Sequence, residues 1–163
     1  MGVKNAAIFI GNSIFGDDRI GLIVGSILRE KLEELDFDVH VIESTGFTLL
    51  DYLEGYERAV IVDSVCSERN PVGQVLSLSL EAFSSVKSGA PHFSGVPEAV
   101  ELMRGLGSGL PHVFIVGINV RDPYHLSDEI SDELKCTVGA ISKEVYVRIR
   151  DLARTEIAAC NCA

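Results

Sequence analysis

The chain has 163 residues, of which 47% are hydrophobic and 23% charged, so it can bury the core of one compact domain and is not disordered. Its 24 acidic and 14 basic residues give a formal net charge of -10, which disfavours nonspecific binding to nucleic acid or to anionic lipid. No apolar run is long enough for a signal sequence or a membrane span, and the four cysteines do not form the dense pattern of a secreted disulfide scaffold. We therefore expect a cytoplasmic domain that binds neither nucleic acid nor a membrane.

The first half of the chain alternates between apolar strands and helices. The unbroken apolar run Ala6–Ile10 is typical of a strand buried on both faces of a parallel sheet. Apolar residues then recur at spacings of three and four over residues 18–35, which predicts an amphipathic helix. Shorter apolar segments predict three further elements: a strand at Val39–Ile42, a helix at Phe47–Leu53, and a strand at Ala59–Val62 that ends in Asp63.

The second half of the chain is less regular. The alternation over Gln74–Leu80 predicts a half-exposed strand that suits an antiparallel edge of the sheet. Residues 83–97 are rich in Ser, Gly and Pro, which indicates a loop. The remaining elements are a helix at Glu98–Leu106, a strand at Val113–Val116, and a long helical region that starts at the N-cap Ser127, reaches about Ala153 and has a potential break at Gly139.

This order of elements favours an α/β fold of three layers, with a mostly parallel twisted sheet flanked by helices, because right-handed crossovers cover both faces of such a sheet. No internal repeat or long linker divides the chain, so we expect a single domain over residues 1–163, with about 155–163 as a frayed tail. Sites in these folds form outside the carboxyl ends of the strands. The loops after the first and third strands are therefore the places to search for chemistry.

Acidic residues follow both of these strands. In the simplest interpretation, Asp17 caps the first helix and Asp18 complements its dipole. Asp63 closes an apolar strand, where a carboxylate is costly to bury unless it is hydrogen-bonded, paired or bound to a metal; hydrogen bonds from the amides of the next turn would be the structural explanation. Because Asp18 and Asp63 face the same edge of the sheet, they could share a proton-transfer task or a cation.

The third candidate is His92, in the loop between Pro91 and Gly95. A single loop histidine is usually a surface residue. If it folds over the two aspartates, however, the set of two carboxylates and one imidazole suits a borderline cation such as Zn²⁺ or Ni²⁺. The chain has neither a G-x-S-x-G nor an H-E-x-x-H motif, so a serine hydrolase of that class or a zincin is not supported.

The segment G-N-S-I-F-G-D-D-R-I-G at residues 11–21 resembles the opening signature of the nickel-iron hydrogenase maturation endopeptidases. Two further landmarks follow in the family's order: V-I-V-D at residues 60–63 resembles its strand-end aspartate, and P-H-F-S-G at residues 91–95 resembles its P-H-x-x-G loop. One departure is Arg19, which stands where a small residue is common and would either lower the pKa of Asp18 or turn away into solvent.

The resemblance implies an endopeptidase that removes the C-terminal extension of a hydrogenase large-subunit precursor after nickel has been inserted. Carried over onto this sequence, the family's metal-sensing residues fall on Asp18, Asp63 and His92, which would be both the catalytic residues and the metal contacts. Nickel is then a recognition element that the substrate precursor carries rather than a cofactor of the free enzyme. The precursor is the implied partner, and we expect the enzyme to be a monomer.

Two alternatives stay open. A non-catalytic nickel-binding or precursor-binding module of the same fold would bind the precursor without shortening it. A plain α/β domain with scattered structural acids would have Asp18, Asp63 and His92 pointing to different places.

Overall fold

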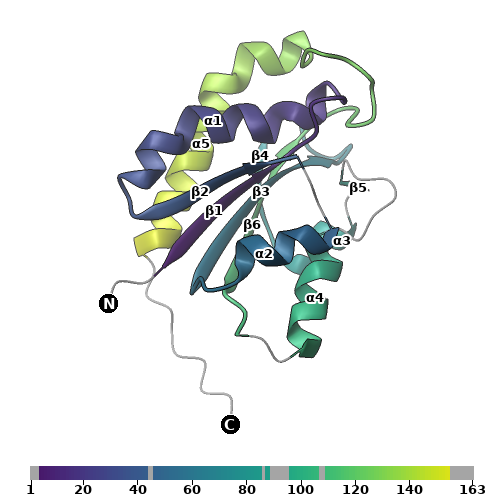
Figure 1. The fold of residues 1–163 in the computed structure, drawn as a ribbon. Helices are drawn as coiled ribbons and strands as arrows, with labels where there is room; N and C mark the ends of the chain where they lie inside the picture. Colours follow the sequence, from purple (N-terminus) through teal and green to yellow (C-terminus); the bar gives the residue numbers. More distant parts are fainter. Residues whose placement is uncertain (1–3, 44–45, 86, 89–95, 107–108, 155–163) are drawn as a thin grey trace.

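A computed structural model describes residues 4–43, 46–85, 87–88, 96–106 and 109–154, and in it one sheet lies between two layers of helices (Figure 1). Six strands form the sheet: β1 (Asn5–Ile10), β2 (Phe37–Ile42), β3 (Arg58–Cys66), β4 (Val75–Leu78), β5 (Lys87–Ser88) and β6 (His112–Asn119). Their order is β2-β1-β3-β6-β4, with β5 paired to the end of β3. The pairs among β2, β1, β3 and β6 are parallel, while β4 and β5 are antiparallel to their neighbours. The predicted three-layer α/β fold, including the antiparallel edge strand, is confirmed.

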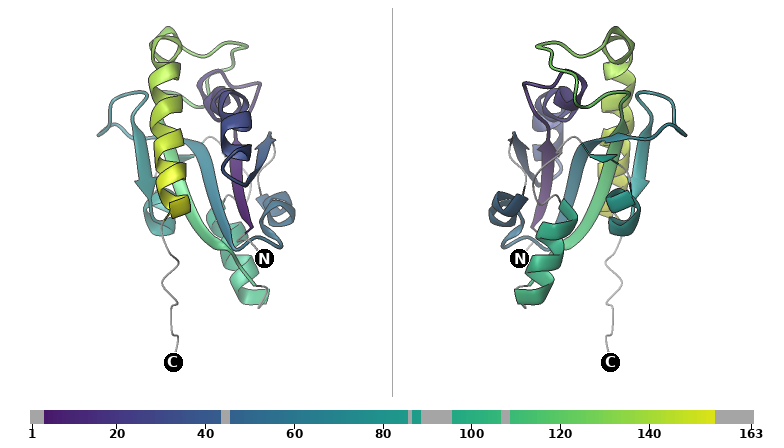
Figure 2. Two further views of the ribbon diagram at one scale, coloured as in Figure 1. Left: turned by 90° about the vertical axis from the view of Figure 1, so that its left-hand side faces the viewer. Right: turned by 90° about the vertical axis from the view of Figure 1, so that its right-hand side faces the viewer.

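The helices divide between the two faces of the sheet (Figure 2). On one face, α1 (Ile20–Glu33) and α5 (Asp132–Arg154) pack in a core with Phe9, Val60 and Val62. The other face carries α2 (Leu49–Leu53), α3 (Leu80–Ser85) and α4 (Val96–Leu106), whose apolar side chains pack with those of Ile8 and Ile61. Two short 3₁₀ turns, η1 (Asp17–Arg19) and η2 (Gly46–Thr48), precede α1 and α2. No helix in the described ranges combines the length and the apolar character that spanning a membrane needs.

Several predicted boundaries differ from the structure, and three of the differences affect the site or the cores. The strand β3 does not end at Asp63 but continues to Cys66, since Ser64 and Val65 stay paired with β6. The helix α3 lies partly within the expected loop, because Phe83 is buried in the second core. The last helix begins at Asp132 rather than after Ser127, and it runs through Gly139 without a break.

Two glycines of the 11–21 segment allow the chain to fold back tightly after β1. A Cβ atom at Gly21 would overlap the carbonyl oxygen of Ile10, and one at Gly11 would lie 2.6 Å from the carbonyl oxygen of Asp18. Neither neighbour can move freely, because both are backbone atoms. The start of α1 therefore packs directly on the end of β1, and this packing fixes the position of η1 and of Asp18 within it.

We predict opposite effects for alanine at two helical glycines. Gly21→Ala should lower the free energy of unfolding by about 2 kcal/mol or more, the range of an overpacked core site. Gly139→Ala is the matched control: no atom outside its own helix lies within 4 Å of an added Cβ, so it should raise stability by about 0.5–1 kcal/mol through helix propensity. Urea unfolding followed by circular dichroism measures both values. Equal stabilities for the two variants would contradict the proposed packing of Gly21.

Candidate functional site

The structure brings Asp18 and Asp63 together at the carboxyl edge of the sheet, where the sequence predicted a site. The pairing of β1 with β3 stops at Phe9 and Val62, so β3 extends past its neighbour from Asp63 onward. Asp18 comes from η1, the turn that follows β1. Both carboxylates are nearly inaccessible, with 5% of Asp18 and 6% of Asp63 exposed to solvent.

Ser64 connects the two carboxylates. Its hydroxyl donates a hydrogen bond to Oδ1 of Asp18, and its backbone N–H donates to Oδ1 of Asp63 at 2.8 Å. The serine itself is completely buried. The sequence analysis missed Ser64, because a serine after an aspartate carries no signal of its own; only the position of η1 shows that its hydroxyl has a carboxylate partner.

Burial makes the ionised form of this pair costly. It raises the pKa of Asp63 well above the usual value for a carboxyl group; the negative charge of Asp18 raises it further, and the Ser64 N–H opposes this. Burial also raises the pKa of Asp18, against the hydrogen bond from the Ser64 hydroxyl. Two carboxylates that interact in this way favour a shared proton or a bound cation.

Asp17 has a separate, structural role. It does not cap the first helix as the simplest interpretation predicted, since no side chain caps η1. Instead its Oδ1 accepts a hydrogen bond at 2.7 Å from the backbone N–H of Ser131, the residue before α5. This contact holds the loop before α5 against the turn that carries Asp18.

Arg19 points away from Asp18. Its guanidinium donates hydrogen bonds to the carbonyl oxygens of Ser13 and Asp128, so it joins the loop after β1 to the loop before α5. Of the two alternatives that the sequence left open, a lowered pKa of Asp18 is not seen, and the arginine binds carbonyl groups rather than pointing into solvent. Its guanidinium therefore binds carbonyl groups and does not form an ion pair with the buried carboxylates.

The loop that follows β6 surrounds the site. The Cys66 thiol donates a hydrogen bond to the carbonyl oxygen of Arg121 at 3.3 Å. The pKa of Tyr124 is raised by burial first and then by the negative charges of Cys66, Asp18 and Asp122. Two hollows of about 430 Å³ and 400 Å³ adjoin this loop, and both include Arg121 and Glu133 in their walls.

Asn119, at the end of β6, fixes the neighbouring loop after β3. It is 1% exposed, its Oδ1 accepts the N–H of Ser67 at 2.8 Å, and its Nδ2 donates to the carbonyl oxygen of Asn70 at 2.7 Å. These bonds hold the loop after β3 against the end of β6. Sequence reasoning missed Asn119 because the predicted strand stopped before it.

The described part of the chain supplies two of the three predicted metal contacts. In it, no group of three or more His, Cys, Asp or Glu side chains is placed to hold a metal ion. His92 lies outside the described residues. Asp18 and Asp63 can offer carboxylate oxygens, which bind divalent cations, but the two alone do not form a complete ligand set.

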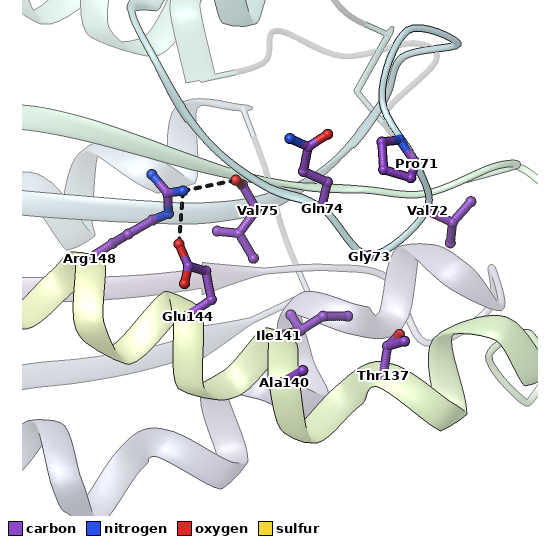
Figure 3. A pocket seen from close by; sticks show the side chains of 10 residues that line it. All are labelled: Pro71, Val72, Gly73, Gln74, Val75, Thr137, Ala140, Ile141, Glu144 and Arg148. Atoms are coloured by element: carbon purple, nitrogen blue, oxygen red, sulfur yellow. Dashed lines mark hydrogen bonds and ion pairs between the residues drawn. The ribbon is translucent and has the colours of Figure 1, made fainter.

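A third hollow lies away from these carboxylates, between the segment that enters β4 and the helix α5 (Figure 3). Its volume is about 560 Å³. On its wall Arg148 forms an ion pair with Glu144 at 2.9 Å and donates hydrogen bonds to the Val75 carbonyl oxygen at 3.1 Å and the Ser77 hydroxyl at 2.7 Å. These contacts attach the edge strand to α5, so the arginine has a structural role.

The raised pKa of Asp63 predicts that the site lowers the stability of the fold. A group whose pKa is raised by folding stabilises the protein while protonated, and that contribution is lost as the pH rises through the folded-state pKa. Asp63→Asn keeps an acceptor for the Ser64 N–H and should therefore raise the free energy of unfolding at pH 8, on the order of 1 kcal/mol or about 2–4 °C in Tm. Near pH 4 the gain should disappear, since the wild-type carboxyl is then protonated.

The control for this prediction is Asp51→Asn, a change of the same chemistry at an exposed position of α2. It should alter Tm little at either pH. Thermal unfolding of the three proteins at both pH values measures the difference, and a destabilised Asp63→Asn variant at pH 8 would contradict the assigned electrostatics.

No protein-family model matches the sequence, and no curated protein sequence matches it. Solved structures do match. The NiFe hydrogenase maturation protease HybD from Thermococcus kodakarensis is 27% identical, with 91% of this chain and 99% of that chain covered and a TM-score of 0.68. The hydrogenase maturating endopeptidase HybD from E. coli is 16% identical, with 92% and 94% covered and a TM-score of 0.69. The hydrogenase 2 maturation peptidase from Thaumarchaeota archaeon SCGC_AB-539-E09 is 23% identical, with 90% and 97% covered and a TM-score of 0.62.

These similarities extend over nearly the whole length of each chain, and the protein most similar in sequence among the three also matches closely in fold. The resemblance that residues 11–21 and 60–63 indicate is therefore confirmed: this chain is similar to the NiFe hydrogenase maturation proteases and has their fold.

Proposed function

We propose that this protein is an endopeptidase that removes the C-terminal extension of a nickel-iron hydrogenase large-subunit precursor after nickel insertion. The observation that carries the proposal is the buried pair Asp18 and Asp63, joined by one serine at the predicted edge of the sheet. The similarity to solved structures that are named as hydrogenase maturation proteases supports the same activity. A structural domain would have no need to bury two interacting carboxylates.

The pair suits a cation that arrives with the substrate. Binding a nickel ion held by the precursor would relieve the repulsion between Asp18 and Asp63 and displace their proton. Among the residues that the structure describes, the two carboxylates form an incomplete ligand set, which fits a metal that the precursor largely coordinates itself. An unloaded precursor lacks this anchor, so its scissile bond is not positioned.

His92 is proposed as the third metal contact. The strand β5 ends at Ser88 and pairs with Val65 and Cys66, on the same strand that carries Asp63. Since β6 pairs with β3 on the other side, β5 lies on the side where β1 has ended. His92 follows Ser88 by four residues, and four residues of chain span at most about 14 Å. We propose that its imidazole contacts the same metal ion as the two carboxylates.

The carboxylates also provide the proton transfers that peptide hydrolysis needs. Water attacks the scissile carbonyl carbon, and the carbon–nitrogen bond then breaks once the leaving amine receives a proton. A carboxylate with a raised pKa can accept the proton from water and return it to the amine. The nickel ion, as part of the substrate, would polarise the carbonyl group if the scissile bond lies beside it.

The first test compares three isosteric variants on a nickel-loaded precursor. Asp18→Asn and Asp63→Asn should each reduce the rate of processing about 100-fold or more, the usual contribution of a general acid or base. Asp17→Asn keeps its acceptor for the Ser131 N–H and should process at close to the wild-type rate. Mass spectrometry of the large subunit measures the loss of the extension. Unimpaired cleavage by Asp63→Asn would contradict the proposal, and wild-type protein that binds the precursor without shortening it would indicate a binding module instead.

The second test uses pH. Because the raised pKa of Asp63 means that a proton must leave before a cation binds, affinity for the nickel-loaded precursor should increase with pH below that pKa, by up to about tenfold for each pH unit. Isothermal titration at several pH values measures the slope, and Asp63→Asn should flatten it. A slope that this substitution leaves unchanged would contradict the role of Asp63 in contacting the metal.

A further inference from the structure

Two loops at the site pair to form a short ribbon, here called the edge ribbon, made of residues 14–16 and 125–127. Phe15 lies opposite Leu126 in an isolated antiparallel bridge. The N–H of Gly16 donates to the carbonyl oxygen of His125 at 2.9 Å, and the N–H of Ser127 donates to that of Ile14 at 3.2 Å. In Figure 1 the purple loop after β1 and the green loop before α5 meet beside the first turn of α1.

The edge ribbon carries the two most exposed large hydrophobic side chains of the described residues. Leu126 is 68% exposed and Ile14 is 63% exposed. Opposed residues of paired strands share a face and sequence neighbours alternate, so Leu126 lies beside Phe15 and Ile14 projects from the other face. An apolar side chain on each face suits a projection that inserts into a partner.

The ribbon is held rigidly on both sides. Arg19 donates hydrogen bonds to Ser13 and Asp128, the residues that flank its two halves. Glu43, at the end of β2, accepts a hydrogen bond from the Ser13 hydroxyl at 2.6 Å. A segment held in this way loses little conformational entropy when it binds, which favours a docking role.

The ribbon also adjoins the site. Asp18 lies two residues after Gly16, and Tyr124, whose pKa rises by burial and by the charges near it, precedes His125. Gly16, His125 and Ser127 form part of the wall of the hollow of about 400 Å³. A protein that covers the edge ribbon would therefore also cover this hollow, beside the turn that carries Asp18.

The residues around the ribbon carry an excess of negative charge, which indicates the charge of its partner. From Asn119 to Lys135 the chain carries five acidic and two basic residues. Both basic residues are paired, Arg121 with Glu133 and Lys135 with Glu129. The exposed side chain of Asp128 is left without an ion pair to any described residue. A basic partner surface would complement this excess of negative charge.

We propose that the edge ribbon is the docking site for the folded body of the precursor, and that it enters an apolar hollow rimmed by Lys and Arg side chains. This inference rests on the proposed function and adds the surface by which the precursor is recognised. The partner is a folded surface rather than an extended peptide, because side chains that project from a rigid ribbon need a preformed concavity, whereas a peptide brings its own side chains to a groove.

The test measures kcat and KM for processing of the full nickel-loaded precursor. The double variant Ile14→Ser with Leu126→Ser should raise KM about tenfold and change kcat less than twofold, since it removes binding shared by the ground and transition states. Ile27→Ser with Leu102→Ser is the matched control, because these side chains are 49% and 39% exposed on α1 and α4, away from the ribbon. The control should leave KM unchanged. Equal Tm values confirm that all variants are folded.

A charge reversal tests the nature of the partner. Asp128→Lys should raise KM several-fold at low ionic strength and reduce its dependence on salt, whereas Glu30→Lys, at an exposed position of α1, should do neither. If the ribbon variants and the controls give the same KM, or if kcat falls while KM stays constant, the docking proposal is wrong.

Binding separates this inference from the proposed function. Fluorescence anisotropy with a labelled precursor gives a Kd that does not depend on cleavage. If wild-type protein binds but does not cleave, the proposed activity fails, while a Kd that rises with the double ribbon variant alone still supports docking. Cleavage by wild-type protein with no effect of the ribbon variants supports the activity and overturns docking. If wild-type protein neither binds nor cleaves, both are overturned.

Discussion

The hydrogen bonds of Ser64 to two carboxylates are the interaction on which the site depends. A single residue gives its backbone N–H to Asp63 and its hydroxyl to Asp18, so the strand β3 and the turn η1, which are far apart in sequence, present their acids at one place. Burial of the pair opposes folding. The rest of the domain compensates for that cost with two apolar cores, one on each face of the sheet. The result is a rigid, electrostatically unsatisfied centre that a cation or a proton can satisfy.

The backbone contacts of residues 11–21 explain why this segment contains glycines and two adjacent aspartates. Its glycines are required by contacts with carbonyl oxygens of Ile10 and Asp18, and its first aspartate fastens the loop before α5. Of its two aspartates, only Asp18 accepts a hydrogen bond from Ser64, the residue that also bonds Asp63. Most of a segment that is easily taken for a ligand-binding motif is therefore scaffolding, which holds one carboxylate at a fixed position.

Much of the fold follows from the sequence, because unbroken apolar runs and helical periodicity depend on local burial. The parallel strands, the first helix and the antiparallel edge at Val75–Leu78 were all predicted in this way. The errors concern features that only tertiary contacts decide: the extension of β3 past Asp63, the start of α5 at Asp132, and the partner of Asp17. For the site, the two aspartates were predicted from their places at strand ends, whereas Ser64 and Asn119 were not, since their roles arise from partners that are distant in sequence.

The bond from Ser131 to Asp17 joins residues 114 positions apart, and such long-range contacts have a consequence for when the site forms during synthesis. The amino-terminal half supplies both acids, but β6, the loop around Tyr124 and the last helix, which enclose them, are synthesised later. While the ribosome is still translating the second half, the two carboxylates lack walls and face water, where neither burial nor repulsion alters their proton affinity. A nascent chain therefore carries the two carboxylates without their raised pKa values, and it gains these values only after β6 and α5 have been made.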